Sequence, residues 1–297
     1  MRRALVLGGG GVAGIAWEVG VLTGLAERGL HVARDADVVI GTSAGASVAA
    51  QLDRGVTLRE LYQRQMAPTH TELDPPVAGE KPTPPIPPKG TSVQDAWRHL
   101  GAAALAAKTV PEGVRRQVIA ARLPSLSWPD RPMMITAVST DGEFRVFDRH
   151  SGVTLVDAVA ASCAVPGVWP PVTIGHKRYM DGGVRSVTNA DLTDGCDVAL
   201  VVSPVFLGIT DTADAELAAA AVPSTYVVRA DPATAAAVGS NLLNPATRAP
   251  AAKAGWALAA LVVDDVRAMW QARAPRSTAN DPPRAVIDKL GSHGRGA

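Results

Sequence analysis

Short apolar runs alternate along this chain with longer stretches that are typical of helices. Residues 4–7 and 38–40 are apolar runs that are each followed by glycine, and buried strands are predicted over residues 4–7 and 36–40. Further strands are predicted over residues 133–138, 143–148, 198–203 and 225–229, and a short one ends at 179–180. Helices are predicted over residues 15–27, 44–54, 58–66, 93–107, 112–121, 155–163 and 245–270. Strands that alternate with helices predict an α/β fold around a mostly parallel sheet.

Proline interrupts this alternation in two places. Eight of the 23 prolines fall between Pro68 and Pro88, so the segment 67–90 cannot hold a regular helix or a central strand. A loop of that length is unusual in a compact domain, and we interpret it as a lid or a disordered linker. The end of the chain, 272–297, is rich in proline and glycine and is predicted to be a flexible tail. The folded domain is therefore predicted to span residues 1–271.

Composition narrows the class of protein. With 297 residues, 47% of them hydrophobic, the chain can bury a large core. The net charge of +1 and the absence of any basic run give no electrostatic case for nucleic acid as a partner. The two cysteines, Cys163 and Cys196, lack C-x-x-C spacing and are interpreted as buried thiols in a reducing compartment. We expect no metal and no cofactor.

The start of the chain superficially resembles a signal peptide. Two arginines precede the apolar run 4–7, but that run stops after four residues in a glycine cluster and no small-residue cleavage site follows. No stretch approaches the roughly 18 apolar residues that a membrane span requires. We expect a cytoplasmic protein and leave open peripheral contact with a membrane or lipid particle.

A G-x-S-x-G pentapeptide at residues 41–45 carries the first candidate chemistry. It lies between the apolar run 38–40 and a small-residue stretch, which predicts strand, sharp turn and helix. This is the context of a nucleophile elbow, with Ser43 as nucleophile. Side chains at Gly41 or Gly45 would crowd the neighbouring strand and helix. The following helix would point its free N–H groups and its dipole toward the Ser43 oxygen.

The glycine cluster at residues 9–14 has two interpretations. It satisfies the G-x-G-x-x-G dinucleotide fingerprint, but the acidic residues Asp35 and Asp37 precede the second strand instead of ending it. Alternatively, its exposed N–H groups form an oxyanion hole for a tetrahedral intermediate. The second interpretation requires both loops to lie at one carboxyl edge of the sheet.

A serine nucleophile needs a base. Of the six histidines, His293 falls in the predicted tail and His176 in a turn beside two basic residues, so surface positions are favoured for both. Asp181 is a sharper candidate, because it follows an apolar strand end and is held by the turn Gly182-Gly183. Asp-Gly is also the commonest ordinary turn signal.

Together these segments resemble the patatin-like phospholipase family. Residues 9–14, which end at Gly14, match its oxyanion glycine motif, residues 41–45 its nucleophile motif and residues 181–183 its D-G-[GA] motif. Residues 161–171 also look like the stretch that precedes this aspartate, and the resemblance covers roughly residues 3–205.

The resemblance implies a three-layer α/β/α fold and a serine–aspartate dyad without histidine. Ser43 would attack an ester carbonyl, Asp181 would accept its proton, and water would resolve an acyl-Ser43 intermediate. The oxyanion would be held by Gly9, Gly10 and Gly11. The substrate would be a lipid or another acyl ester. Asp181 would have to lie about 2.6–3.2 Å from Ser43 Oγ.

The chain departs from the family pattern at several positions. Ala13 stands where many members carry Arg or Lys, which puts a phospholipid preference in doubt. The loop looks one residue longer around Trp17 and Glu18, and Asn189 lacks the proline that often follows it. None of these departures removes a member of the dyad.

Three functions therefore stay open. A lipid acyl hydrolase (phospholipase A, lysophospholipase or lipid esterase) is the leading hypothesis. The others are a dinucleotide-binding oxidoreductase that uses residues 9–14 and a non-catalytic lipid-binding module with a vestigial dyad. Apolar helix faces between residues 91 and 121 would suit acyl chains and would equally suit ordinary core packing.

Overall fold

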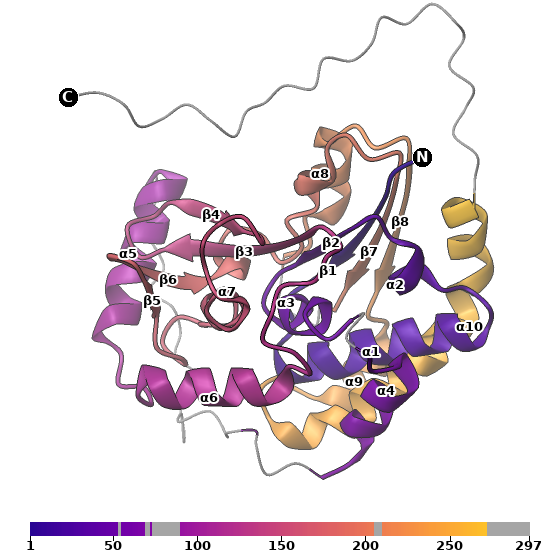
Figure 1. Cartoon of the computed structure of the whole chain (residues 1–297), viewed down its shortest axis with the longest axis horizontal. Coiled ribbons are helices and arrows are strands. Elements are labelled where there is room, and N and C mark those ends of the chain that lie inside the picture. Colours follow the sequence, from indigo (N-terminus) through magenta and orange to yellow (C-terminus); the bar gives the residue numbers. More distant parts are fainter. Residues whose placement is uncertain (53–54, 69–71, 73–89, 205–209, 272–297) are drawn as a thin grey trace, which may run out of the picture.

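A mixed eight-stranded sheet forms the centre of the computed structural model, which describes residues 1–52, 55–68, 72, 90–204 and 210–271 (Figure 1). The strand order is β5-β6-β3-β2-β1-β7-β8, and β4 also pairs with β3. The strands are β1 Arg3–Leu7, β2 Val38–Gly41, β3 Met133–Ser139, β4 Phe144–Phe147, β5 Val172–Ile174, β6 Lys177–Asp181, β7 Val198–Ser203 and β8 Ser224–Arg229. Strands β3, β2, β1, β7 and β8 run parallel, whereas β4, β5 and β6 pair in antiparallel fashion.

Helices cover both faces of this sheet (Figure 1). They are α1 Gly11–Glu27, α2 Val32–Asp35, α3 Ala44–Ala49, α4 Leu58–Met66, α5 Val93–Ala106, α6 Glu112–Arg122, α7 Leu155–Ser162, α8 Ala213–Ala219, α9 Pro232–Val238 and α10 Arg248–Gln271. Three short 3₁₀ turns are η1 Gly182–Val184, η2 Ala190–Thr193 and η3 Pro245–Thr247.

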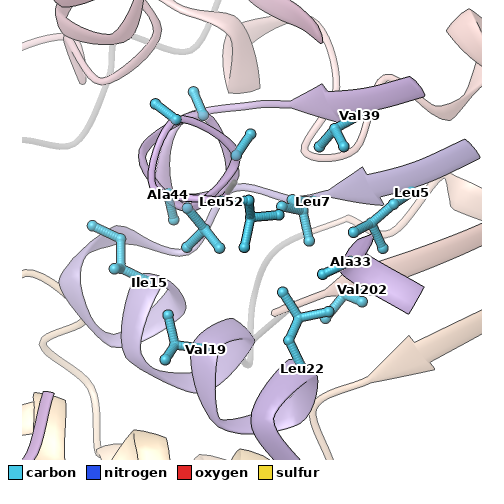
Figure 2. Packing of buried hydrophobic residues seen from close by; sticks show 14 of the residues in the cluster. Leu5, Leu7, Ile15, Val19, Leu22, Ala33, Val39, Ala44, Leu52 and Val202 are labelled. Carbon is cyan, nitrogen blue, oxygen red and sulfur yellow. The ribbon is translucent and has the colours of Figure 1, made fainter. Parts of the chain in front are cut away.

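The two faces of β1 separate the core into two parts. Leu5 and Leu7 belong to the larger cluster, which includes residues of α1, α3, α7 and α10, and Figure 2 shows both pointing toward the α1 side. Ala4 and Val6 point to the opposite face, where Leu217 of α8 contributes to the smaller cluster. Because successive side chains of a strand point to opposite faces, the four consecutive apolar residues of β1, Ala4 to Leu7, require a covering layer on each side. The predicted three-layer α/β/α fold is confirmed.

The longest helix, α10, packs along α1 through glycines. A Cβ atom built on Gly20 would lie 2.2 Å from the carbonyl oxygen of Ala252, and one on Gly255 would lie 2.2 Å from that of Trp17. Only hydrogen at these positions allows the two backbones to approach so closely. The predicted capping by Asn244 is confirmed, since Asn244 Oδ1 accepts the N–H of Ala246 at 2.9 Å and Pro245 follows directly, but this cap opens the 3₁₀ turn η3 and α10 itself begins at Arg248.

Two expectations fall largely or wholly outside the described residues. The proline-rich segment 67–90 is described only at residues 67, 68, 72 and 90, and the tail 272–297 is not described, so the lid and the tail remain predictions. Among the helices that the structure describes, none combines the length and the apolar content needed to cross a bilayer.

Candidate active site

Ser43 occupies a strained turn between β2 and α3. Its backbone has φ 54° and ψ −111°, a conformation that L-residues rarely adopt and that costs of order 1–3 kcal/mol. The turn is anchored from α7: the N–H of Ser43 donates to Ser162 Oγ at 2.8 Å, and the thiol of Cys163 donates to the Ser43 carbonyl at 3.1 Å. Because the surrounding side chains hold this backbone, the serine hydroxyl is presented at the carboxyl edge of the sheet.

The two glycines of the elbow leave no space for a side chain. A Cβ atom on Gly45 would lie 2.0 Å from the carbonyl oxygen of Leu7, and one on Gly41 would lie 2.6 Å from Cα of Ala46. The crowding predicted for both positions is confirmed. It arises because α3 leaves the sheet directly over the end of β1 (Figure 2).

Asp181, at the end of β6, is the hydrogen-bond acceptor for Ser43. The Ser43 hydroxyl donates to Asp181 Oδ2 at 2.7 Å, inside the range expected for a nucleophile and its base. The other carboxylate oxygen, Oδ1, accepts the N–H of Gly183 at 2.8 Å. Both side chains are buried, at 7% and 5% relative exposure. The Asp-Gly-Gly turn therefore fixes the rotation of the carboxylate and leaves one oxygen for Ser43.

Burial raises the pKa of Asp181 to about 6. Loss of solvent disfavours the charged carboxylate, while the Ser43 hydroxyl, the Gly183 N–H and the positive charge of Arg115 lower the pKa in part. A carboxylate with this pKa is deprotonated at neutral pH but is a far better proton acceptor than an exposed aspartate. A perturbed group of this kind beside a strained serine is typical of catalytic sites.

The glycine loop lies against Ser43. A Cβ atom on Gly9 would lie 3.5 Å from Cβ of Ser43, so the loop and the elbow meet at one edge of the sheet. The Gly9 N–H donates to the Val187 carbonyl at 2.8 Å, which differs from its expected role as an oxyanion donor. The N–H groups of Gly10 and Gly11 have no acceptor within the described part of the chain, and Gly11 adopts φ +64°.

A buried polar cluster connects the elbow to the segment that follows Asp181. The hydroxyls of Thr42 and Thr136 lie 2.8 Å apart, and Asn189 Nδ2 donates to Thr42 Oγ1 at 3.0 Å and to the Ser186 carbonyl at 2.7 Å. Sequence reasoning treated Asn189 only as a departure from a family pattern. Its fully buried amide now identifies it as a bridge between β2, β3 and the Asp181 turn.

The remaining sequence candidates lie elsewhere. Asp37 accepts the backbone N–H of Arg3 at 2.7 Å, at the amino end of β1 and away from the glycine loop. This placement gives no acidic residue where the dinucleotide fingerprint needs one. Among the histidines that the structure describes, none is hydrogen-bonded to Ser43, and His70 and His293 fall outside the described residues.

A small pocket opens above Ser43. Its wall is mostly apolar, and its charged groups are Arg115 and Arg122 of α6, which the sequence analysis did not single out. The pocket is lined by Gly11, Val12, Ile15, Ser43, Ala44, Arg115, Arg122, Cys163, Val165, Trp169 and Leu243. Ala13 is fully buried within α1 and its N–H donates to the Leu242 carbonyl.

Comparison with known proteins assigns these features to a family. A family model described as Patatin-like phospholipase matches residues 5–194, a span that contains the glycine loop, the elbow and Asp181. Among solved structures, VipD from Legionella pneumophila is similar at 12% identity and a TM-score of 0.46, with 89% of this chain and 67% of VipD covered. The type III effector protein ExoU is similar at 19% identity and a TM-score of 0.36, with 88% of this chain and 53% of ExoU covered. This chain thus spans about half the length of ExoU. None of the curated proteins matches the sequence.

Proposed function

Because this chain belongs to the patatin-like phospholipase family, we propose that it is a serine acyl hydrolase that cleaves lipid esters through Ser43 and Asp181. One observation supports this proposal above all others. The Ser43 hydroxyl, on a strained elbow, donates to the buried carboxylate of Asp181 at 2.7 Å. A serine hydroxyl is a weak nucleophile until an adjacent base accepts its proton.

In the first half of the proposed reaction, Ser43 becomes acylated. Ser43 Oγ attacks the ester carbonyl carbon while its proton passes to Asp181 Oδ2, and the carbonyl oxygen becomes an oxyanion. When this tetrahedral intermediate collapses, the bond to the alcohol oxygen breaks and the alcohol leaves with the proton from Asp181. The products of this half are the free alcohol and acyl-Ser43.

Water completes the proposed cycle. Asp181 accepts a proton from a water molecule while the oxygen of that water attacks the acyl carbonyl carbon. The second tetrahedral intermediate then releases the carboxylic acid, and Ser43 Oγ recovers the proton from Asp181. The raised pKa of Asp181, about 6, supports a direct proton acceptor without histidine, since a base works best when its pKa lies near the working pH.

The oxyanion of both intermediates would be stabilised by the glycine loop. Gly10 and Gly11 are the proposed donors, because the Gly9 N–H already donates to Val187 within the protein. Backbone donors fixed before the reaction need no reorganisation as charge develops, and one such donor contributes about 3–4 kcal/mol in other hydrolases. Gly9 would instead hold the loop beside Ser43.

Active-site labelling tests this proposal. A fluorophosphonate probe should label the wild-type protein and the control Ser240→Ala, whose serine is exposed. It should not label Ser43→Ala, and Asp181→Asn should lose turnover of acyl esters. A wild-type protein that stays unlabelled while a known serine hydrolase is labelled would contradict the proposal. Labelling without turnover of any acyl ester would favour the non-catalytic lipid-binding module.

A further inference from the structure

We propose that Arg115 forms an anion-binding subsite beside Ser43, so that the preferred substrates are acyl esters that carry a phosphate or carboxylate group near the scissile bond. This inference rests on the proposed function and deepens it by naming the substrate class. It is carried by the burial of Arg115, by its missing partners and by its place in the wall of the Ser43 pocket.

Two of the three guanidinium nitrogens of Arg115 are buried without a hydrogen-bond partner in the described part of the chain. The residue is 3% exposed, and its Nε and Nη1 atoms find no acceptor among the described residues. Buried polar groups in folded proteins are almost always hydrogen-bonded, and a buried unpaired charge is costly. A protein that maintains such a group at its candidate active site has donors available for a ligand.

The other buried arginines nearby show how this fold satisfies a guanidinium when no ligand is involved. Arg122, two turns further along α6, donates to both oxygens of Glu72 at 2.8 and 2.5 Å. Arg248 donates to Gln65 Oε1 at 3.0 Å and to backbone carbonyls, including that of Ala67. The missing acceptors are therefore specific to Arg115 and do not reflect a general shortage of acceptors in this region.

Arg115 and Ser43 line the same pocket. The guanidinium carbon of Arg115 lies 4.0 Å from the centre of the Trp169 ring. Stacking on an aromatic face holds the planar group in place, while its N–H bonds, which lie in the plane, stay available at the edge. That edge matches the paired oxygens of a carboxylate or phosphate group.

The carboxylates near Arg115 attract its charge but give it no hydrogen bond among the described contacts. Glu72 and Asp181 raise the pKa of Arg115 in part, yet the oxygens of Glu72 accept from Arg122 and those of Asp181 accept from Ser43 and Gly183. Burial also raises the pKa of the Cys163 thiol, so this group is neutral. Although burial lowers the pKa of Arg115 to about 10, the side chain remains cationic at neutral pH. An anionic group on the substrate would supply the acceptors that the described residues do not provide.

Matched substrates and variants test the inference. The variants are Arg115→Met, which keeps length without charge, and Arg115→Lys, which keeps charge without the planar edge. The control is Arg116→Met, whose arginine follows on the same helix but pairs with Glu112 and Asp157 at the surface. The substrates share one acyl chain: a monoacylglycerol, its 3-phosphate, and an ester of equal size that ends in a carboxylate.

The wild type and Arg116→Met should prefer an anionic ester over the neutral one by kcat/KM. Arg115→Met should lower this preference by about tenfold or more, the effect of losing a hydrogen bond to a charged group, and Arg115→Lys should restore only part of it. The phosphate and carboxylate arms identify which anion is bound. Inorganic phosphate should inhibit the wild type competitively and should inhibit Arg115→Met less.

Two results would overturn the inference. One is a preference that is absent in the wild type or unchanged in Arg115→Met. The other is an equal loss on all three esters together with an upward shift of the acidic limb of the pH profile, which would show that Arg115 acts only on Asp181. Fluorophosphonate labelling distinguishes failure of this inference from failure of the proposed function. If Ser43 is labelled while either of these results is found, the Arg115 inference fails and the proposed function stands.

Discussion

Ser43 and Asp181 are joined by a 2.7 Å hydrogen bond although 138 positions separate them in the chain. Strand β3 brings them together, because it pairs with β2, which leads into the Ser43 turn, and with β6, which ends at Asp181. Gly41, two residues before Ser43, pairs with Ile135 of β3, and Asp181 pairs with Ala137 of the same strand. The dyad therefore depends on a strand that contributes neither of its members.

The first prediction concerns the pH dependence of turnover. Since Asp181 must be deprotonated to accept the Ser43 proton, and its pKa is about 6, kcat/KM on a neutral soluble ester should fall tenfold per pH unit below pH 6. A profile from pH 4.5 to 8 measures this limb. A midpoint near 4, the ordinary value for an aspartate, would show that burial does not perturb Asp181.

The second prediction concerns a buried carboxyl group in α1. Burial raises the pKa of Glu18 well above its ordinary value, and the Gly8 backbone N–H lowers it only in part. The unfolded chain releases the Glu18 proton at lower pH than the folded protein does. The contribution of Glu18 to the unfolding free energy is therefore fully present below about pH 4.5 and is lost as the pH rises toward the folded pKa.

Glu18→Gln should remove that pH-dependent loss. We expect its free energy of unfolding at pH 7 to exceed that of the wild type, because the buried amide does not ionise as the pH rises. The control Glu27→Gln changes a glutamate on the same helix whose side chain is 38% exposed, and it should have little effect because the amide oxygen can still accept from Trp256 Nε1. Urea unfolding at pH 5 and pH 7 measures the unfolding free energy of both variants. If Glu18→Gln exceeds the wild type by the same amount at the two pH values, the raised pKa of Glu18 is contradicted.

The third prediction concerns the elbow glycine. Gly45→Ala places a methyl group 2.0 Å from the Leu7 carbonyl oxygen, so α3 must move away from β1. We expect a loss of about 3 kcal/mol in unfolding free energy and loss of Ser43 labelling. Gly113→Ala is the matched control, because nothing lies within 4 Å of its Cβ position on α6, and it should be neutral or slightly stabilising. Similar losses in both variants would rule out the crowding argument.

The fourth prediction concerns the anchor of the strained turn. Ser162→Ala removes the acceptor of the Ser43 N–H and leaves that buried donor unpaired. The cost of about 1–3 kcal/mol should appear as a rate of Ser43 labelling that is about 5- to 150-fold slower. Ser240→Ala again serves as the control. An unchanged labelling rate in a folded Ser162→Ala protein would mean that the elbow holds its conformation without α7.

Local backbone chemistry made much of the fold predictable, together with the Ser43 elbow and the Asp181 turn of the candidate site. Glycines that surround Ser43, an aspartate before Gly182-Gly183 and apolar runs of strand length are all features of adjacent residues. They predicted the elbow, the Asp181 turn and the parallel centre of the sheet. The short strand β5 and the helices α8 and α9 carried weaker signals and were not predicted, and the helix predicted over 44–54 ends at Ala49.

The sequence by itself therefore determined which residues can do the chemistry, because turn geometry and burial patterns are encoded within a few neighbouring positions. Only the tertiary structure decided which groups meet. Strand order places Asp181 against Ser43. The packing of loops and helices directs the Gly9 N–H to Val187 and, within the described residues, gives Nε and Nη1 of Arg115 no acceptor. These contacts join positions far apart in the chain, so they follow from how the sheet pairs and how the helices pack upon it.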